Sequence, residues 1–331
     1  MKNDFKNILA INFGGIGDEI FFLPTLISLK KEFSNSKITL ALEPRSKSVK
    51  DLTHIIDELF LVDIKGRHKY FELLKLIFWA RKGKFDLVIS SGANKFISVL
   101  LFLTGIRERY GYDSGFLSQK LLTKAVPLNK NQYACAMYHD LVKFVTNECT
   151  LLPEIDIEPQ EKIPNSVLIH PGVSKMSVQK GMIKTIGPQV WAETIDILLN
   201  AGKKVILAGG PDDTECIETI RKTVKNKNYE DYFGKTKSLK ELGVLIAKAE
   251  KFICSDSAPL HVAVALKTQT YVIFGPTDDK KLIPQCDFIA PIKARDNCPI
   301  KPCLWEHRQT TCETLNCLTI TAEDIAKYIL S

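Results

Sequence analysis

The sequence predicts an α/β protein made of two Rossmann-like, doubly wound parallel-sheet domains that face each other across a cleft. Three observations lead to this prediction. Short apolar stretches alternate with longer helical stretches in both halves of the chain, which favours parallel sheets with right-handed crossovers. A polar stretch interrupted by prolines separates the halves. The length of 331 residues also exceeds what one hydrophobic core usually organises.

The first half begins with the apolar run NILAINF at residues 7–13, which is typical of a strand buried on both faces of a sheet. Further elements follow in alternation. Strands are predicted at residues 37–42, 58–62 and 85–90, and helices at residues 19–33, 69–81 and 95–104. Together they define an N-terminal domain over residues 1–155.

A linker rich in proline and acidic residues leads to a second alternating series. Strands are predicted at residues 166–170, 204–208, 251–254 and 270–274, and helices at residues 189–200, 214–224, 239–249 and 321–330. The second domain is therefore placed at residues 165–320, and residues 321–331 form a separate final helix.

Composition limits the possible functions. The net charge of +7 favours anionic partners, but no basic run is dense enough to indicate nucleic acid. No apolar run approaches the ~18 residues that span a bilayer, and the N-terminus is interpreted as a strand rather than a signal peptide. We therefore expect a cytoplasmic protein whose nine cysteines are reduced.

The stretch 251–277 places polar residues at the end of a buried strand. Asp256, Ser257 and His261 follow the strand at 251–254 and lie at the start of a short apolar helix. Free N–H groups and the helix dipole favour anionic ligands there. Taken alone, an Asp-Ser pair at a helix start is more often only a cap.

Glycines follow the first strand directly, at Gly14, Gly15 and Gly17, before Asp18. They allow a tight turn and close approach of a ligand to the backbone. The spacing is not the GxGxxG fingerprint of dinucleotide-binding domains, and Glu43 is only near the position of a ribose-binding acid. This argues against a nucleotide-dependent oxidoreductase, which stays an alternative.

These two motifs resemble those of glycosyltransferase family 9, the bacterial heptosyltransferases that transfer heptose from ADP-heptose to lipopolysaccharide core. The resemblance rests on Asp256-Ser257 with His261, on the loop Gly275-Pro276-Thr277, and on Gly17-Asp18 with Pro24 six residues after the aspartate. Ala258 stands where the family has glycine. The resemblance implies the two-domain GT-B fold, a last helix that packs back on the first domain, and no required cofactor.

The resemblance also implies roles for residues at the two motifs. Asp18 would be the base that deprotonates the acceptor hydroxyl; the alternative is an acid favoured by the helix dipole. A lysine of the loop 171–188 would contact the donor diphosphate, and we favour Lys184 over Lys180. The remaining implied donor-side residues are Glu215, Asp256, Ser257, His261, Gly275, Pro276 and Thr277. Asp256 is expected to bond backbone N–H groups or a sugar hydroxyl.

The acceptor side is expected near Gly15, Gly17 and Asn94, with Arg107 and Arg109 as partners for an acidic acceptor. The alternative for each arginine is a solvated surface charge. The basic and aromatic segment 65–84 could lie on an anionic inner-membrane surface, but we favour a crossover helix with basic flanks. The helix at 95–104 raises the same question.

Four cysteines lie close together near the C-terminus, at Cys298, Cys303, Cys312 and Cys317, with His307 between them. They could hold a structural zinc ion, but none has the usual CxxC spacing, so we predict no metal site.

We therefore predict an inverting glycosyltransferase that transfers heptose from ADP-heptose to a lipopolysaccharide-type acceptor. Three alternatives remain. The enzyme could use another nucleotide sugar or a protein acceptor, it could be the oxidoreductase, or it could be an inactive sugar-nucleotide-binding protein.

Overall fold

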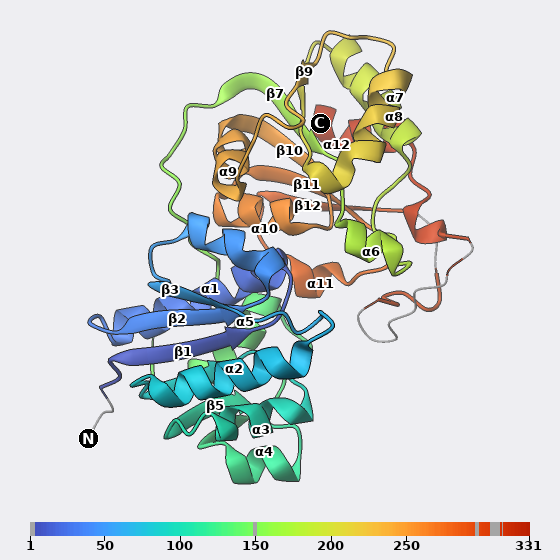
Figure 1. Ribbon diagram of the computed structural model, residues 1–331. Coiled ribbons are helices and arrows are strands. Elements are labelled where there is room, and N and C mark those ends of the chain that lie inside the picture. The colour runs from blue at the N-terminus through green and yellow to red at the C-terminus, as the bar shows by residue number, and fades with distance from the viewer. Residues whose placement is uncertain (1–3, 148–150, 295–297, 305–311, 313) are drawn as a thin grey trace. The chain divides into compact units, whose positions relative to one another are not determined.

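The structure is a computed structural model that describes residues 4–147, 151–294, 298–304, 312 and 314–331 (Figure 1). The chain divides into two compact units, Met1–Asp156 and Ile157–Ser331. Among the described residues, no helix has the length and apolar character that crossing a membrane requires.

Unit 1 contains a parallel six-stranded sheet in the order β3-β2-β1-β4-β5-β6. The strands are β1 (Asn7–Asn12), β2 (Lys37–Leu42), β3 (Glu58–Leu61), β4 (Leu87–Ser90), β5 (Glu108–Tyr112) and β6 (Lys124–Val126). The helices are α1 (Ile16–Glu32), η1 (Pro44–Leu52), α2 (Lys69–Lys82), α3 (Lys95–Leu103), α4 (Phe116–Leu121), α5 (Ala134–His139) and η2 (Asp140–Val142). This order reverses direction between β1 and β4, where doubly wound proteins bind ligands.

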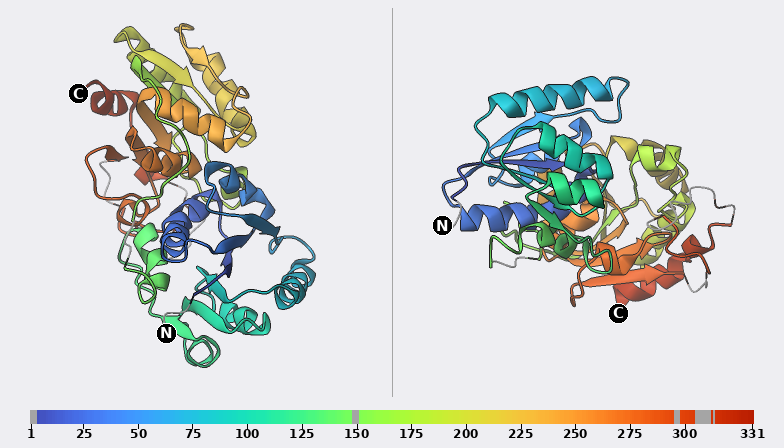
Figure 2. Two further views of the ribbon diagram at one scale, coloured as in Figure 1. Left: turned by 90° about the vertical axis from the view of Figure 1, so that its left-hand side faces the viewer. Right: turned by 90° about the horizontal axis from the view of Figure 1, so that it is seen from below.

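Both faces of this sheet are buried. Alternate residues of β1 point to opposite sides, so Leu9 and Ile11 pack with Leu76 of α2 and Leu101 of α3, whereas α1 packs against the same strand from the other side. Figure 2 shows from two further directions that helices cover both faces of each sheet. Parallel strands that are covered on both faces have nearly continuous apolar sequences, and β1 could be predicted for this reason.

Unit 2 repeats the same strand order in its own sheet, β12-β11-β10-β7-β8-β9, again entirely parallel. The strands are β7 (Ile163–His170), β8 (Lys204–Leu207), β9 (Glu230–Asp231), β10 (Ala249–Ser255), β11 (Gln269–Phe274) and β12 (Ile289–Lys293). The helices are α6 (Lys175–Gln179), α7 (Pro188–Asn200), η3 (Pro211–Asp213), α8 (Thr214–Thr223), α9 (Leu239–Lys248), α10 (Ala258–Ala265), α11 (Asp279–Leu282), η4 (Asn316–Leu318) and α12 (Ala322–Leu330). Here the reversal lies between β7 and β10.

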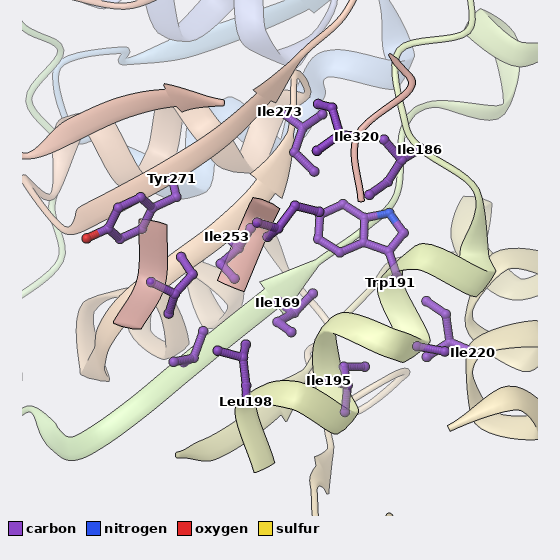
Figure 3. Packing of buried hydrophobic residues seen from close by; sticks show 14 of the residues in the cluster. Ile169, Ile186, Trp191, Ile195, Leu198, Ile220, Ile253, Tyr271, Ile273 and Ile320 are labelled. Carbon is purple, nitrogen blue, oxygen red and sulfur yellow. The ribbon is translucent and has the colours of Figure 1, made fainter. Parts of the chain in front are cut away.

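The core of unit 2 is centred on Trp191 of α7, which is fully buried (Figure 3). Ile169 of β7 and Ile253 of β10 face it from the sheet. The last helix, α12, packs against α7 and adds Ile325 to this core. These contacts make α12 part of unit 2.

The predicted fold class is confirmed, with two doubly wound parallel sheets. The strands β5, β6, β9 and β12 were not predicted from the sequence. Strand β5, with the sequence ERYGY, carries charged residues in place of an apolar run. The other three lie at edges of their sheets, and β9 has only two residues, Glu230 and Asp231, which are not apolar. Edge strands with few buried residues lack the apolar run that marks a central parallel strand.

Candidate active site

The carboxyl edge of the unit 2 sheet holds a buried carboxylate, Asp256, directly after β10. Its Oδ2 atom lies 3.2 Å from the Lys184 Nζ atom and accepts a hydrogen bond of 2.9 Å from the Thr277 hydroxyl. The Asp256 side chain is only 3% exposed. Burial alone would raise its pKa, but the ammonium of Lys184 and the other neighbours lower the pKa below its ordinary value. Asp256 is therefore ionised at neutral pH.

A hydroxyl network holds the loop that carries Lys184. Thr185 donates to the Pro171 carbonyl at 2.7 Å and accepts from the Ser255 hydroxyl at 2.8 Å and from the Trp191 indole at 3.3 Å. Ser255 also lies 2.9 Å from the Pro171 carbonyl. Because Trp191 and Ser255 are fully buried, these bonds tie the loop to the core next to Asp256.

His261 is buried in α10, 4% exposed, in the electrostatic surroundings of Asp256 and Lys184. Burial is the main cause that lowers its pKa, to about 4; Lys184 adds to this effect and Asp256 opposes it. His261 is therefore neutral at pH 7 and can act as a hydrogen-bonding group rather than as a cation.

A second carboxylate of unit 2, Asp213 at the end of η3, approaches the loop that follows β7. Its Oδ2 atom accepts a 2.7 Å hydrogen bond from the Gly210 N–H. A Cβ atom on Gly172 would lie 1.7 Å from the Asp213 Oδ1 atom, so only glycine permits this approach. The His170 Nε2 atom lies 3.7 Å from Asp213, and burial lowers the pKa of this histidine.

In unit 1, Asp18 lies at the carboxyl edge of the sheet, in the first turn of α1. Its Oδ2 atom accepts a 2.7 Å hydrogen bond from the Gly15 N–H, and the Tyr138 hydroxyl lies 3.5 Å from its Oδ1 atom. A Cβ atom on Gly14 would lie 2.2 Å from the Asp18 Cβ atom, so Gly14 gives Asp18 its space. Asp18 is only partly buried, which leaves it accessible to a substrate hydroxyl.

A second acid of α1, Glu19, is buried beside Asp18 and is 1% exposed. Among the described residues, neither of its carboxyl oxygens has a partner within hydrogen-bonding geometry. Burial, and then the charge of Asp18, raise the pKa of Glu19 well above its ordinary value. Nearby, the carboxylate of Glu43 lies 3.3 Å from the Arg45 Nε atom and 3.7 Å from the Lys65 Nζ atom.

Residues 74–313 match the family model for glycosyltransferase family 9 (heptosyltransferase). The chain belongs to glycosyltransferase family 9. It is therefore a glycosyltransferase, and family membership overturns the oxidoreductase alternative. Among its relatives, lipopolysaccharide heptosyltransferase 3 of Escherichia coli K12 is 25% identical over 283 residues, which cover 79% of this chain and 80% of the relative.

Solved structures share the fold. A family 9 glycosyltransferase from Veillonella parvula matches with a TM-score of 0.76 and 23% identity, covering 99% of this chain and 97% of that chain. The E. coli heptosyltransferase WaaC, solved with ADP-2-deoxy-2-fluoro heptose, matches with a TM-score of 0.73 and 15% identity over 98% of this chain and 99% of that chain.

The structure brings together several residues that the family motifs single out on the donor side. Lys184, Asp256 and Thr277 are in direct contact, and His261 lies beside them. Lys180, the other loop lysine, is exposed. Asp256 bonds the side chains of Lys184 and Thr277.

The remaining donor-side residues lie at the same carboxyl edge of the unit 2 sheet. Ser257 is the N-cap of α10, and its hydroxyl lies 3.4 Å from the Ser255 carbonyl. Glu215 is exposed in the first turn of α8. Gly275 packs under Leu318, where a Cβ atom would lie 2.5 Å from a leucine methyl, and the Pro276 carbonyl accepts from the Leu304 N–H.

On the acceptor side, Gly15 and Gly17 lie beside Asp18 at the start of α1. Asn94 follows β4 and caps α3 by accepting a 3.0 Å hydrogen bond from the Phe96 N–H. Arg107 and Arg109 lie at the amino end of β5, the sheet edge opposite to Asp18. The guanidinium of Arg109 donates to the carbonyls of Ile106, Arg107 and Leu121, so this side chain holds loops together.

Among the described residues, no group of three or more His, Cys, Asp or Glu side chains is placed to hold a metal ion. Cys303 and Cys317 are buried, and His307 lies outside the described residues.

Several residues of the site were not predicted from the sequence. Thr185 and Ser255 join the donor-side network, and Tyr138 approaches Asp18 from α5. A hydroxyl residue in a loop carries no spacing signal, and Tyr138 is 120 residues from Asp18 in the sequence. The signal that could have identified Ser255 is its position as the last residue of an apolar strand, beside Asp256.

Removal of the Lys184 charge tests the buried pair. Lys184→Met leaves the Asp256 carboxylate buried with Thr277 as its remaining bonded partner, and we expect a loss of about 1–3 kcal/mol of stability in denaturant unfolding. The double variant Lys184→Met/Asp256→Asn should recover part of that loss, because the uncompensated charge is gone. Lys180→Met is the matched control; an equal loss there would contradict the pairing.

Glu19 should make stability depend on pH. Because its pKa is raised in the folded protein, the folded state holds this proton more tightly than the unfolded state. The resulting stability is complete below the ordinary carboxyl pKa and is lost as the pH rises through the raised pKa. Glu19→Gln should therefore be more stable than the wild type at pH 8, by about 0.5–2 kcal/mol, with a smaller difference at pH 4. Thermal unfolding at both values measures this; Glu58→Gln, at an exposed site, serves as the control. A constant offset at both values would exclude Glu19 as the source.

Proposed function

We propose that this family 9 enzyme transfers a heptose from ADP-heptose to a hydroxyl of a lipopolysaccharide core acceptor, with inversion at the anomeric carbon. The acceptor oxygen attacks the anomeric carbon, the bond from that carbon to the diphosphate oxygen breaks, and ADP leaves with the electron pair. The acceptor proton passes to a carboxylate. Each proton and charge in this step has a candidate residue in the chain.

The donor diphosphate is assigned to the carboxyl edge of the unit 2 sheet. Lys184 is 22% exposed, so its ammonium can reach a ligand while it stays paired with Asp256. The N-terminus of α10 adds free N–H groups and the positive end of the helix dipole at Ser257. Together these groups offset the negative charge that develops on the leaving diphosphate.

The base is assigned to Asp18. Its carboxylate is partly exposed, is oriented by the Gly15 N–H and lies near the Tyr138 hydroxyl, which burial keeps protonated by raising its pKa well above the ordinary value. A carboxylate fixed in this way can accept the proton of an acceptor hydroxyl. The base thus belongs to unit 1 and the donor residues belong to unit 2.

The sugar and the acceptor are proposed from the relatives. The solved WaaC structure contains an ADP-heptose analogue, and the curated relative is a lipopolysaccharide heptosyltransferase. An acceptor carried by a lipid would bring the enzyme to the cytoplasmic surface of the inner membrane. The observation that carries the proposal is the Asp256–Lys184–Thr277 cluster at the strand reversal of unit 2, in a chain that belongs to this family.

Nucleotide binding tests the donor assignment. A ligand that binds only the folded state raises its stability, by about 2.7 kcal/mol at one hundred times its dissociation constant. We expect ADP and ADP-heptose to raise the thermal unfolding midpoint, and UDP, GDP and NAD to have little effect. A larger shift with UDP or GDP would leave the assignment as a glycosyltransferase in place and would show that the donor carries a different nucleotide.

Substitution of Asp18 tests the base. Asp18→Asn keeps an oxygen that can accept from the Gly15 N–H but removes the basic carboxylate. We expect turnover to fall by about 10²–10⁴-fold, with the ADP-induced midpoint shift unchanged. Asp63→Asn is the matched control, because Asp63 accepts a hydrogen bond of the same 2.7 Å length from the Gly66 N–H. Unchanged turnover in Asp18→Asn would remove Asp18 as the base, and a wild type that binds ADP without turnover would favour an inactive binding protein.

A further inference from the structure

Helix α2 carries a second apolar stripe that faces solvent. Its core side packs under the sheet through Leu76, Ile77 and Ala80. On the outer side, Tyr70, Phe71, Leu74 and Phe78 are 71%, 66%, 51% and 61% exposed. Positions 70, 74 and 78 are spaced by four residues and so form one stripe along the helix. A helix that only connects two strands of the sheet needs only the buried stripe. The interpretation of α2 as a crossover helix with basic flanks therefore does not explain the exposed stripe.

The exposed apolar surface extends over two further helices. Phe96 and Phe102 of α3 are 68% and 49% exposed, and Phe116 of α4 is 72% exposed. Helices α3 and α4 pack against each other, and the Arg81 side chain of α2 donates to the Leu103 carbonyl at the end of α3. Figure 1 shows α2, α3 and α4 side by side in unit 1, and we refer to their exposed apolar residues as the aromatic face.

Cations are interspersed with these aromatic rings. Helix α2 contains four lysine and arginine residues, and α3 and α4 contain one lysine each, against a single acid, Glu72. The ammonium groups of Lys69, Lys95 and Lys120 lie 4.9, 5.5 and 5.8 Å from the ring centres of Tyr70, Phe96 and Phe116. The aromatic face is therefore both apolar and positively charged.

The topology places the first turns of these three helices, and so one end of the aromatic face, toward the sheet edge of the candidate base. In a parallel sheet, the helix that follows a strand begins near the carboxyl end of that strand. Helices α2, α3 and α4 follow β3, β4 and β5, and Phe71, Phe96 and Phe116 lie in the first turns of these helices. They therefore lie toward the same sheet edge as Asp18, which follows β1.

We propose that the aromatic face docks unit 1 on an anionic phospholipid bilayer. Aromatic side chains beside lysines suit the interface between headgroups and acyl chains, where anionic lipids attract the cations. Lysine is depleted in protein–protein interfaces, so the same composition argues against a protein partner. The proposal rests on the proposed function in one respect: a lipid-carried acceptor at this surface would present its sugar toward the edge that holds Asp18.

Vesicle co-sedimentation tests the proposal with the full chain. We expect binding to phosphatidylethanolamine vesicles that contain phosphatidylglycerol, weaker binding at high salt, and little binding to pure phosphatidylcholine. The triple variant Phe71→Ser/Phe96→Ser/Phe116→Ser should lose at least about tenfold in partition, because three apolar side chains no longer enter the interface. Its matched control is Val178→Ser/Tyr328→Ser/Leu330→Ser, which removes exposed apolar side chains from unit 2.

The cations are tested separately. Lys69→Gln/Lys95→Gln/Lys120→Gln should lose roughly fivefold in partition per charge at low salt and show a weaker salt dependence. The control is Lys222→Gln/Lys225→Gln/Lys240→Gln, at exposed positions of unit 2. Absence of wild-type binding, equal binding to pure phosphatidylcholine, or unchanged binding of the two test variants would each overturn the proposal.

Two further measurements separate the possible failures. Analytical ultracentrifugation of the wild type and the phenylalanine variant detects a second copy on the aromatic face, and a wild-type dimer that this variant abolishes would overturn the bilayer assignment. The ADP-induced midpoint shift, measured on every variant, reports on the donor site alone. A wild type that binds no vesicles but shows an intact ADP shift overturns only the docking surface, whereas an absent ADP shift in the wild type overturns only the donor assignment.

Discussion

Burial of both faces of each parallel sheet is the constraint on which the rest of the structure depends. The buried middles of β1 and β10, residues 8–11 and 252–254, are entirely apolar, so polar groups are confined to the points where the chain enters or leaves the sheet. There, free N–H groups at helix starts can hold carboxylates and anions. Asp18 and Asp256 both occupy such points, one in each unit, because no other part of the sheet accommodates a charge at low cost.

One local device recurs in the two units. In unit 1 the Gly15 N–H donates to Asp18 three residues later, and in unit 2 the Gly210 N–H donates to Asp213 at the same spacing and the same length of 2.7 Å. In both cases a nearby glycine, Gly14 or Gly172, leaves room for the carboxylate. This hydrogen-bonded turn begins a helix and also fixes the position of a carboxylate. A carboxylate in the first turn of a helix can therefore be held in place by the backbone, which is what the proposed role of Asp18 requires.

The sequence predicted those features that depend on neighbouring residues. The central strands were visible as apolar runs, and the polar residues that follow them were visible at the strand ends. The partners of those residues could not be predicted from the sequence, because the Lys184–Asp256 and Tyr138–Asp18 contacts join positions 72 and 120 residues apart. The contacts of Arg109 were equally invisible. Its charge suggested a ligand, and in the structure its Nε and Nη1 atoms donate to backbone carbonyls at the other edge of the sheet.

Exposed aromatic side chains on α2, α3 and α4 add nothing to the core of unit 1, because separate residues of α2 and α3 already cover that side of the sheet. Large apolar patches on a monomer carry a cost in solubility and usually mark an interaction site. Here each of the three helices has an aromatic residue in its first turn with a lysine beside it. Three separate segments of the chain therefore have the same combination of an aromatic ring and a lysine at one sheet edge. Packing within unit 1 does not explain this combination, whereas the proposed docking on an anionic bilayer does.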